Sequence, residues 1–248
     1  MDKKMKKSYL VWKNGELSRH FLKNIRRAVP MSGEQLEVML RVIEGGMPDV
    51  KNFLDLGCGD GALGRLILSK YPSAQGLLLD LSEQMIGDAR QMCKEYAGRT
   101  GFILEDLNRN TWADNIRKDF PFDVIVSGFA IHHLTDRRKK QLYREIFGLL
   151  RPGGIFLNIE HVSSSTDWLE SVWDNLFIDS LYDFHRAATP GKSREEVASS
   201  YHNRLDKEAN ILAPVEAQCK WLRNSGYVDV DCYFKLFELA VFGGRRPG

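Results

Sequence analysis

The sequence has no hydrophobic run long enough to cross a membrane. Its apolar stretches, such as 76–79 and 124–126, are a few residues long, whereas a spanning helix needs about 20. It also lacks an excess of one charge, because 35 lysines and arginines stand against 33 aspartates and glutamates, so no strong field attracts a polyanion. No repeat or low-complexity tract is present. These absences exclude a helical membrane protein and a repeat protein.

Cysteine is sparse. The four residues Cys58, Cys93, Cys219 and Cys232 lie far apart and form no C-x-x-C pair. The basic segment 1–7 is not followed by the long apolar core of a secretory signal. We therefore expect a cytoplasmic protein with reduced, mostly buried thiols, and neither a disulfide framework nor a metal site.

The composition that is present, with 43% hydrophobic and 27% charged residues in 248, is typical of a globular domain. Short apolar runs alternate with helical patterns along the middle of the chain. The runs are 53–56, 76–79, 102–104, 122–126 and 155–159, and the helical patterns are 62–71, 82–96 and 137–150. Strands alternating with helices predict a doubly wound α/β fold, with a mainly parallel sheet covered on both faces.

The flanks of this α/β region have helical patterns. We expect a helix over 16–27 and a second one that Ser32 caps, with Gln35 in the capping-box position. A closing helix over 216–225 precedes two strands, 228–233 and 237–242. The whole chain, 1–248, is interpreted as one domain. Its parts are N-terminal helices forming a lid (1–49), a core (50–162), a helical insertion (163–214), and a closing helix with strands (215–248).

A glycine-rich turn, Asp55-Leu56-Gly57-Cys58-Gly59-Asp60-Gly61, directly follows the first predicted strand and precedes a helix. Glycine permits positive φ there, and the helix N-terminus offers free N–H groups to a ligand. The turn also contains Gly59-x-Gly61-x-x-Gly64, so a dinucleotide site remains a candidate. The sequence predicts a nucleotide-type site at this turn.

Three carboxylates refine this site. Asp80 ends the second strand, where it can bind both ribose hydroxyls. Asp55 at the end of the first strand suits an ammonium-bearing ligand better than a pyrophosphate. Asp106 follows the third strand, where a carboxylate can accept from an adenine amino group while the next backbone N–H meets a ring nitrogen. The alternative role of Asp106 is a turn or helix cap.

These segments together resemble the ordered motifs of class I S-adenosylmethionine-dependent methyltransferases. The resemblance covers about 50–159 and rests on 55–61, Asp80, Asp106, 122–125 and 150–154. It implies a seven-stranded sheet with an antiparallel last strand, S-adenosylmethionine as cofactor, and S-adenosylhomocysteine as product. The cofactor residues it implies are Asp55, Gly57, Cys58, Gly59, Gly61, Asp80, Leu81, Met85, Asp106, Leu107, Ser127, Gly128 and Phe129. Methyl transfer to a small molecule is the function that it favours.

The flanks are similar to those of bacterial carboxy-S-adenosylmethionine synthases. The similar segments are 26–30, 183–187 and 214–217. Those enzymes share the fold but convert the cofactor with prephenate. The chain departs from them at Gly59-Asp60 and in having a histidine pair within 128–133. A synthase-like reaction therefore stays an alternative, and an NAD-dependent oxidoreductase or a non-catalytic cofactor-binding subunit are less favoured alternatives.

Three histidines follow strands at the carboxyl edge of the sheet, where ligands of α/β proteins bind: His132, His133 and His161. A neutral imidazole there could take a proton from an attacking hydroxyl or amine. The alternative for His132 and His133 is that one ring packs under the next helix and the other caps a turn. Shared metal ligation is not expected, because adjacent histidines on an extended segment diverge.

The insertion supplies candidate substrate-binding residues, namely Arg204 with Tyr201 and His202 beside it. An arginine can pair bidentately with a carboxylate or phosphate, so we expect an anionic acceptor. By the resemblance, Arg204 falls in the substrate-binding arginine region of the synthases. Its alternative is a surface pair with Asp206 or Glu208. We interpret the basic run 137–140 as a solvated helix face and expect no nucleic-acid partner, and a monomer or homodimer.

Overall fold

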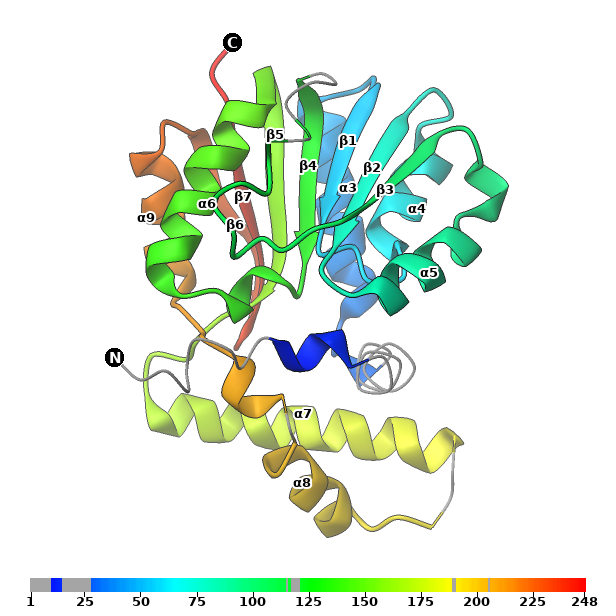
Figure 1. Ribbon diagram of the computed structural model, residues 1–248. Coiled ribbons are helices and arrows are strands. Elements are labelled where there is room, and N and C mark those ends of the chain that lie inside the picture. The colour runs from blue at the N-terminus through cyan, green and yellow to red at the C-terminus, as the bar shows by residue number, and fades with distance from the viewer. Residues whose placement is uncertain (1–9, 15–27, 115, 117–120, 189–190, 205) are drawn as a thin grey trace.

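The computed structural model describes residues 10–14, 28–114, 116, 121–188, 191–204 and 206–248. A seven-stranded sheet in the order β3-β2-β1-β4-β5-β7-β6 forms its centre (Figure 1). The strands are β1 (Asn52–Leu56), β2 (Gln75–Asp80), β3 (Thr100–Leu104), β4 (Phe122–Gly128), β5 (Leu150–His161), β6 (Val228–Leu236) and β7 (Leu239–Arg245). Strands β1 to β5 pair in parallel, and β7 runs antiparallel to both β5 and β6. The predicted doubly wound fold and antiparallel last strand are confirmed.

Helices cover both faces of the sheet. Helices α3 (Ser32–Gly46), α4 (Ala62–Lys70) and α5 (Glu83–Met92) pack on one face, and α6 (Asp136–Leu149) and α9 (Val215–Asn224) pack on the other (Figure 1). Successive strand residues are apolar because each face needs its own core: Phe53 belongs to the cluster under α3 and α4, and Leu54 to the cluster under α6. Each such buried side chain contributes about 1.5–3 kcal/mol.

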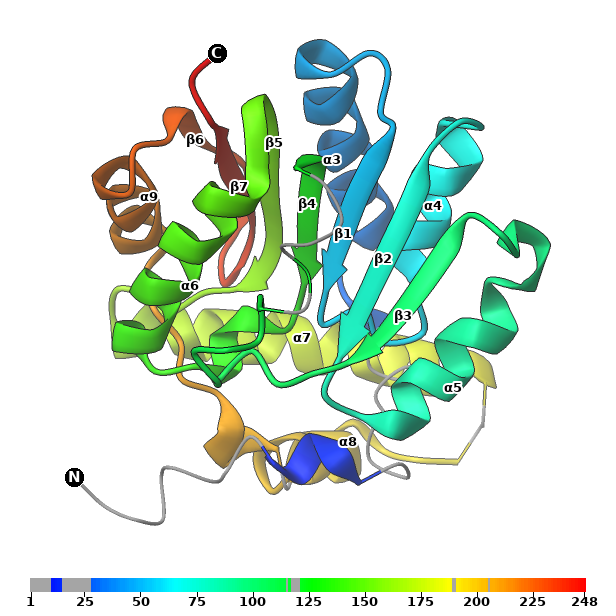
Figure 2. The same cartoon turned by 45° about the horizontal axis from the view of Figure 1, so that its top comes forward.

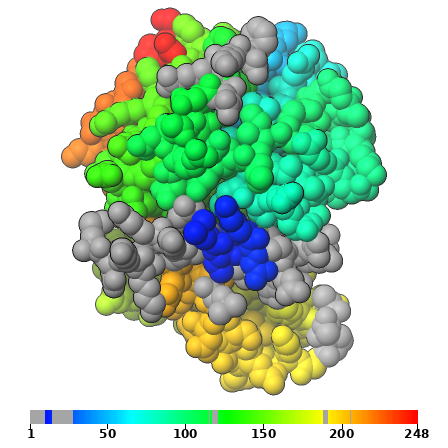
Figure 3. All heavy atoms as spheres, in the orientation of Figure 1, coloured from blue at the N-terminus to red at the C-terminus, as the bar shows by residue number. Residues whose placement is uncertain are grey.

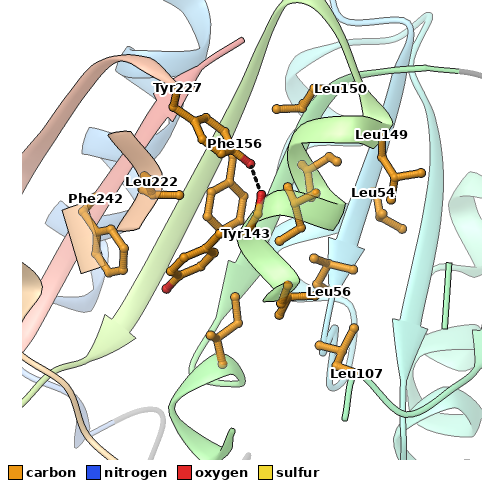
Figure 4. Packing of buried hydrophobic residues seen from close by; sticks show 14 of the residues in the cluster. Leu54, Leu56, Leu107, Tyr143, Leu149, Leu150, Phe156, Leu222, Tyr227 and Phe242 are labelled. Carbon is orange, nitrogen blue, oxygen red and sulfur yellow. Dashed lines mark hydrogen bonds between the residues drawn. The ribbon is translucent and has the colours of Figure 1, made fainter. Parts of the chain in front are cut away.

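The core under α6 and α9 is closed by aromatic side chains (Figure 4). Tyr143 on α6 packs against Phe156 on β5, with ring centroids 5.7 Å apart. Tyr227, which follows α9, donates its hydroxyl hydrogen to the Tyr143 carbonyl at 3.0 Å. This bond ties the closing segment to α6, and it satisfies a buried hydroxyl that would otherwise be costly.

Some element ends differ from the sequence prediction. Met31, with φ of 52°, is the N-cap of α3, and Ser32 is its first helical residue, so the predicted capping box is wrong. The Gln35 side chain donates instead to the Pro30 carbonyl at 3.0 Å. The helix predicted over 82–96 ends at Met92, before a separate 3-10 turn at Lys94–Tyr96. The helix expected over 16–27 lies outside the described residues.

The insertion lies across the carboxyl ends of the parallel strands (Figures 1 and 2). It consists mainly of α7 (Asp167–Ala188) and α8 (Arg194–His202), as its helical pattern predicted. Residues 10–14 lie on the visible face between the sheet and this insertion (Figure 3). No helix among the described residues is both long and apolar enough to cross a membrane. Helix α7 thus lies opposite the strand ends, which is the edge where α/β sheets bind ligands.

Candidate functional site

The glycine turn after β1 is held to the end of β2. Gly57, Gly59 and Gly61 all have positive φ, of 66°, 55° and 77°. A Cβ added to Gly57 would lie 2.2 Å from the Cβ of Ala130, so glycine is required there. The Gly59 N–H donates to Asp80 Oδ2 at 2.9 Å. The backbone of this turn is thus fixed against the strand that follows it.

Two buried carboxylates organise the turn. Asp80 is 9% exposed, and its Oδ1 accepts from the Ser82 N–H at 2.9 Å. Burial raises the pKa of Asp80, and the backbone hydrogen bonds from Ser82 and Gly59 oppose that rise. Each Asp80 oxygen keeps further accepting capacity for ligand hydroxyls. Asp55 Oδ2 accepts from the Gly64 N–H at 2.9 Å, which fixes the first turn of α4.

A first pocket opens at this turn, with about 910 Å³ of empty space, part of it open to solvent. Its lining residues are Trp12, Asp55, Gly57, Cys58, Gly59, Leu63, Leu79, Asp80, Leu81, Met85, Glu105, Asp106, Leu107, Gly128, Phe129, Ala130, His133 and Leu134. Most of the expected cofactor residues therefore line one cleft.

Two expected cofactor residues do not line this pocket. Ser127 is fully buried, and its hydroxyl donates to the Leu56 carbonyl at 2.9 Å, so it joins β4 to β1. Gly61 is the N-cap of α4, where a Cβ would lie 3.0 Å from Leu78 and 3.1 Å from the Cys93 sulfur. Both residues shape the cleft from behind it.

The far end of the first pocket is built by the loop after β3. Leu107 lines the pocket, and its carbonyl accepts from Arg138 Nε at 2.7 Å. The Arg138 guanidinium also donates to the Arg109 carbonyl at 3.2 Å and to both oxygens of Glu145. The Leu107 N–H makes no hydrogen bond with any described residue, so this donor remains available to a ligand. Arg138 is buried, and the expectation that 137–140 is a solvated face is wrong for it.

The donors and acceptors in this pocket fit S-adenosylmethionine. Asp80 offers a carboxylate to a vicinal diol, and the Leu107 N–H with Asp106 offers a donor and an acceptor to an adenine edge. Apolar side chains form the walls between them. Asp55 lines the pocket at the start of the turn, where a carboxylate suits an ammonium group. The pocket therefore defines a nucleoside-binding α/β protein.

A second pocket, with about 610 Å³ of empty space that is partly open to solvent, adjoins the first, and the two share Trp12, Phe129 and His133. It lies between the strand ends and the helices of the insertion. Its other lining residues are Val29, His132, His161, Trp173, Phe177, Tyr201, Arg204, Asp206, Asn210 and Leu239. Eight of these thirteen residues carry an aromatic or imidazole ring, so the walls are largely planar and apolar.

His133 lies at the boundary of the two pockets. Its Nδ1 is 3.2 Å from the Ala209 carbonyl, which can only accept, so Nδ1 carries the proton. Nε2 of the neutral ring is then left as an acceptor. Burial lowers the pKa of His133 well below its usual value, and a positive charge on His132 would lower it further. His133 is consequently neutral at pH 7, which suits a base.

Two histidine–carboxylate pairs lie behind His133. His132 Nδ1 is hydrogen-bonded to Glu160 Oε1, and burial lowers the pKa of His132 and raises that of Glu160. His161 Nε2 donates to Glu238 Oε2 at 2.8 Å. The rings of His132 and His133 lie 4.0 Å apart, because both residues belong to a 3-10 turn (Ile131–His133). The expectation that they diverge is wrong.

Each of His132, His133 and His161 has one ring nitrogen hydrogen-bonded to a protein acceptor, namely Glu160, the Ala209 carbonyl and Glu238 in that order. Across the part of the chain that the structure describes, no group of three histidine, cysteine or acidic side chains could hold a metal ion.

The position of Arg204 is compatible with both roles predicted for it, binding of an anionic substrate and pairing with a neighbouring acid. Its guanidinium centre lies 4.2 Å above the Tyr201 ring, and Nη1 donates to the Tyr201 carbonyl at 2.7 Å. Its Nε is 3.6 Å from Asp206 Oδ2, as in the surface-pair alternative. Its side chain is nevertheless only 17% exposed and lines the second pocket together with Tyr201. His202 lies outside both pockets, 46% exposed and 3.8 Å from Asp174.

The segment after Arg204 is hydrogen-bonded to the 3-10 turn that contains His132 and His133. The Ile211 N–H donates to the His132 carbonyl at 2.8 Å, and Lys139 Nζ donates to the Ile211 carbonyl. The Lys139 side chain is fully buried, and burial lowers its pKa. Lys139 is the second residue of 137–140 that is not solvated.

Sequence reasoning missed several residues of the second pocket. Trp173 and Phe177 are four residues apart on α7, a spacing that puts them on one helix face and could have marked them. Nothing in the sequence around Trp12 indicates that it reaches both pockets. Asn210 is an isolated polar residue whose place depends on the contacts of 209–211.

Comparisons with known proteins agree with this geometry. Residues 54–156 match the family model of a methyltransferase domain. A carboxy-S-adenosyl-L-methionine synthase from Nautilia profundicola is 22% identical over 220 residues, which cover 88% of this chain and 87% of that protein. A demethylmenaquinone methyltransferase from Leptospira interrogans is 29% identical over 141 residues, 56% of this chain and 54% of that one.

Among solved structures, an O-methyltransferase family protein from Burkholderia thailandensis superimposes with a TM-score of 0.61 at 19% identity. The match covers 88% of this chain and 57% of that longer protein, so it shows the shared fold. The matched domain, the motif order and the seven-stranded sheet together support a class I S-adenosylmethionine-dependent methyltransferase, the group of proteins that this chain is similar to.

Proposed function

We propose that the protein transfers a methyl group from S-adenosylmethionine, bound in the first pocket, to a small-molecule acceptor in the second. The observation that carries this proposal is the position of His133, which lines both pockets and has its Nδ1 proton turned toward the Ala209 carbonyl. When bound, S-adenosylmethionine supplies an electrophilic methyl group on a sulfonium sulfur. The protein residues then have to hold the acceptor in line and remove its proton.

His133 is proposed as the general base. Its lowered pKa keeps the imidazole neutral at pH 7, and Nε2 is the nitrogen free of the Ala209 bond. The buried His132–Glu160 pair packs against it and fixes its position. We assign His132 and His161 to positioning, because each has a ring nitrogen bonded to a glutamate.

Acceptor binding is proposed for Arg204 and Tyr201, and not for His202. The Arg204 guanidinium is held by the Tyr201 carbonyl and ring, so little side-chain freedom is lost when it binds a ligand. The cofactor contacts come from other elements, at the ends of β1, β2 and β3. Cofactor and acceptor binding should therefore respond to different substitutions.

The test of the base is His133→Gln, with His202→Gln outside both pockets as the matched control. We expect kcat to fall about 10²- to 10⁴-fold in the first variant and to stay unchanged in the control. Because the pKa of His133 is lowered, the wild-type rate should stay constant through neutral pH and fall only in more acidic solution, where Nε2 becomes protonated. His133→Gln should lose that acid limb. A variant with the wild-type rate and pH profile would contradict the assignment.

A synthase-like reaction is the second candidate, because the carboxy-S-adenosyl-L-methionine synthase from Nautilia profundicola aligns with 88% of this chain. Incubation with S-adenosylmethionine and prephenate separates the two by the mass of the nucleoside product. Methyl transfer yields S-adenosylhomocysteine, and the synthase reaction yields a nucleoside with an added carboxyl group. The second product would replace the methyltransferase proposal.

A nucleic-acid acceptor is not proposed. In the basic run 137–140, the Arg138 and Lys139 side chains are buried and bind internal carbonyls, so half of the run is withdrawn from any phosphate backbone. A cytoplasmic location and a monomeric or homodimeric state remain predictions from the sequence.

A further inference from the structure

One wall of the second pocket is a set of packed aromatic rings. Trp173 and Phe177 stack at 5.1 Å between centroids, with planes 16° apart. Tyr201 of α8 meets Phe177 edge-on at 5.5 Å. Phe129 and Trp12 lie where the second pocket meets the first pocket. A ligand entering the second pocket therefore lies against flat, apolar surfaces, which favour a flat, apolar ring.

Two buried polar atoms in the lining of this pocket have no hydrogen-bond partner among the described residues. They are Nε1 of Trp173, which can only donate, and Oδ1 of Asn210, which accepts. The Trp173 side chain is itself almost completely buried. Because buried polar groups are nearly always satisfied, these atoms point to a ligand that presents both an acceptor and a donor.

Arg204 supplies hydrogen-bond donors to the second pocket. Its Nη1 donates to the Tyr201 carbonyl, its Nε lies 3.6 Å from Asp206 Oδ2, and its Nη2 makes no hydrogen bond within the described residues. Guanidinium N–H groups bind carboxylate oxygens well, so Nη2 suits a ligand that carries an oxygen acceptor.

The pKa of His133 also bears on which kind of hydroxyl group this residue can deprotonate. Burial makes His133 a weak base, because it lowers the pKa of the imidazole. Proton transfer to a weak base has a larger driving force when the hydroxyl that loses the proton is more acidic. A phenolic hydroxyl has a pKa of about 10, several units below that of an alkyl alcohol or water.

We propose that the acceptor is a phenol, whose ring packs against Trp173 and Phe177 and whose hydroxyl faces His133 at the boundary of the two pockets. The proposal rests on the methyl transfer inferred above and adds the substrate class. The phenolic proton goes to His133 Nε2 as a bond forms between the oxygen and the methyl carbon. The bond from that carbon to sulfur breaks, and sulfur keeps its electron pair as a thioether. The products are an aryl methyl ether and S-adenosylhomocysteine.

Two matched pairs of probes test this on the full chain: 2-naphthol against decahydro-2-naphthol, and 4-hydroxybenzoate against trans-4-hydroxycyclohexanecarboxylate. Each pair keeps the hydroxyl group and removes the aromatic ring. We expect the aromatic member of each pair to bind about tenfold tighter by titration calorimetry, and only aromatic members to yield S-adenosylhomocysteine. Equal binding within the pairs, or no binding of either aromatic probe at about 1 mM, would overturn the proposal.

Substitutions on α7 supply the matched control. Trp173→Leu should remove the preference for the aromatic probes, and Trp173→Phe, which keeps a ring if the leucine variant does not fold, should weaken it. Trp168→Leu should leave it unchanged, because Trp168 is on the same helix but 71% exposed. Aromatic preference without transfer would contradict the methyltransferase proposal and leave the binding class standing. Transfer to the saturated alcohols would contradict the phenol proposal and leave the methyltransferase proposal standing.

Discussion

Arg138 provides the most quantitative test of how the cofactor pocket is supported. Its guanidinium donates to the Leu107 carbonyl at 2.7 Å and the Arg109 carbonyl at 3.2 Å, which holds the loop after β3 against α6. It also forms a two-point bridge to Glu145, at 3.0 and 2.7 Å. Arg138→Met keeps much of the side-chain volume and removes all four bonds.

The expected loss of stability depends on how well Glu145 is solvated and hydrogen-bonded once the Arg138 guanidinium is removed. Removing one partner of a buried ion pair costs about 3–5 kcal/mol, because the other charge is left without its counterion. Glu145 keeps 21% of its side chain exposed and still accepts from Trp112 Nε1 at 2.6 Å. Its remaining charge is thus partly solvated and hydrogen-bonded, so the cost should fall at the lower end, about 3 kcal/mol.

Urea unfolding measures this change, with Arg137→Met as the control because Arg137 is the exposed neighbour on the same helix turn. We expect the control to change the free energy of unfolding by less than about 0.5 kcal/mol. Affinity for S-adenosylmethionine should also fall about tenfold in Arg138→Met, because the Leu107 N–H is no longer held in place. Equal stability of the two variants would refute the argument that Arg138 supports the loop.

Three further predictions concern the two pockets. Asp80→Ala should weaken S-adenosylmethionine binding by about 1–3 kcal/mol in titration calorimetry, and the wild type should bind NAD far more weakly; preferential NAD binding would contradict the cofactor assignment. Gly59→Val should abolish cofactor binding with a nearly unchanged circular dichroism spectrum, because φ is 55° and a side chain there would meet the ligand. Arg204→Ala should weaken binding of an anionic acceptor by about 2–4 kcal/mol and leave cofactor affinity unchanged. An unchanged acceptor affinity would make Arg204 a structural partner of Asp206 alone.

The sheet and the cofactor pocket could be predicted because their signals are local. Consecutive apolar residues such as Phe53 and Leu54 indicate a strand covered on both faces. The glycines after β1 and Asp80 at the end of β2 are brought together by parallel pairing of these strands. The site thus follows from strand order and from residues at strand ends.

The buried cations of α6 were misjudged although a signal existed. Arg138 and Lys139 share the helix face of Leu142, Tyr143 and Ile146, which is the face that packs on the sheet. Composition favoured a solvated run, whereas the helical period places two of its four residues inward. A long cation on the core-facing side of a helix has to find internal acceptors, and these two find carbonyl groups.

The second pocket could be predicted only in part. The candidates His132, His133, His161, Tyr201 and Arg204 line it, but the rest of its lining depends on contacts between distant segments. The tautomer of His133 is set by its hydrogen bond to the Ala209 carbonyl, which lies 76 residues further along the chain. Phe129 reaches both pockets from a backbone with φ of 52°, which is unusual for an aromatic residue and has no sequence signature. Trp12 comes from a segment outside the α/β core.

The central claim is that the transferable methyl group lies where the two pockets meet. The most direct measurement is an intermolecular nuclear Overhauser experiment on the complex with S-adenosylmethionine that carries an isotope-labelled methyl group. We predict contacts from that methyl group to ring protons of Phe129 and His133, two of the three residues common to both pockets. Contacts restricted to Met85 and Leu107, with none to His133, would place the methyl group away from the acceptor pocket and contradict the account.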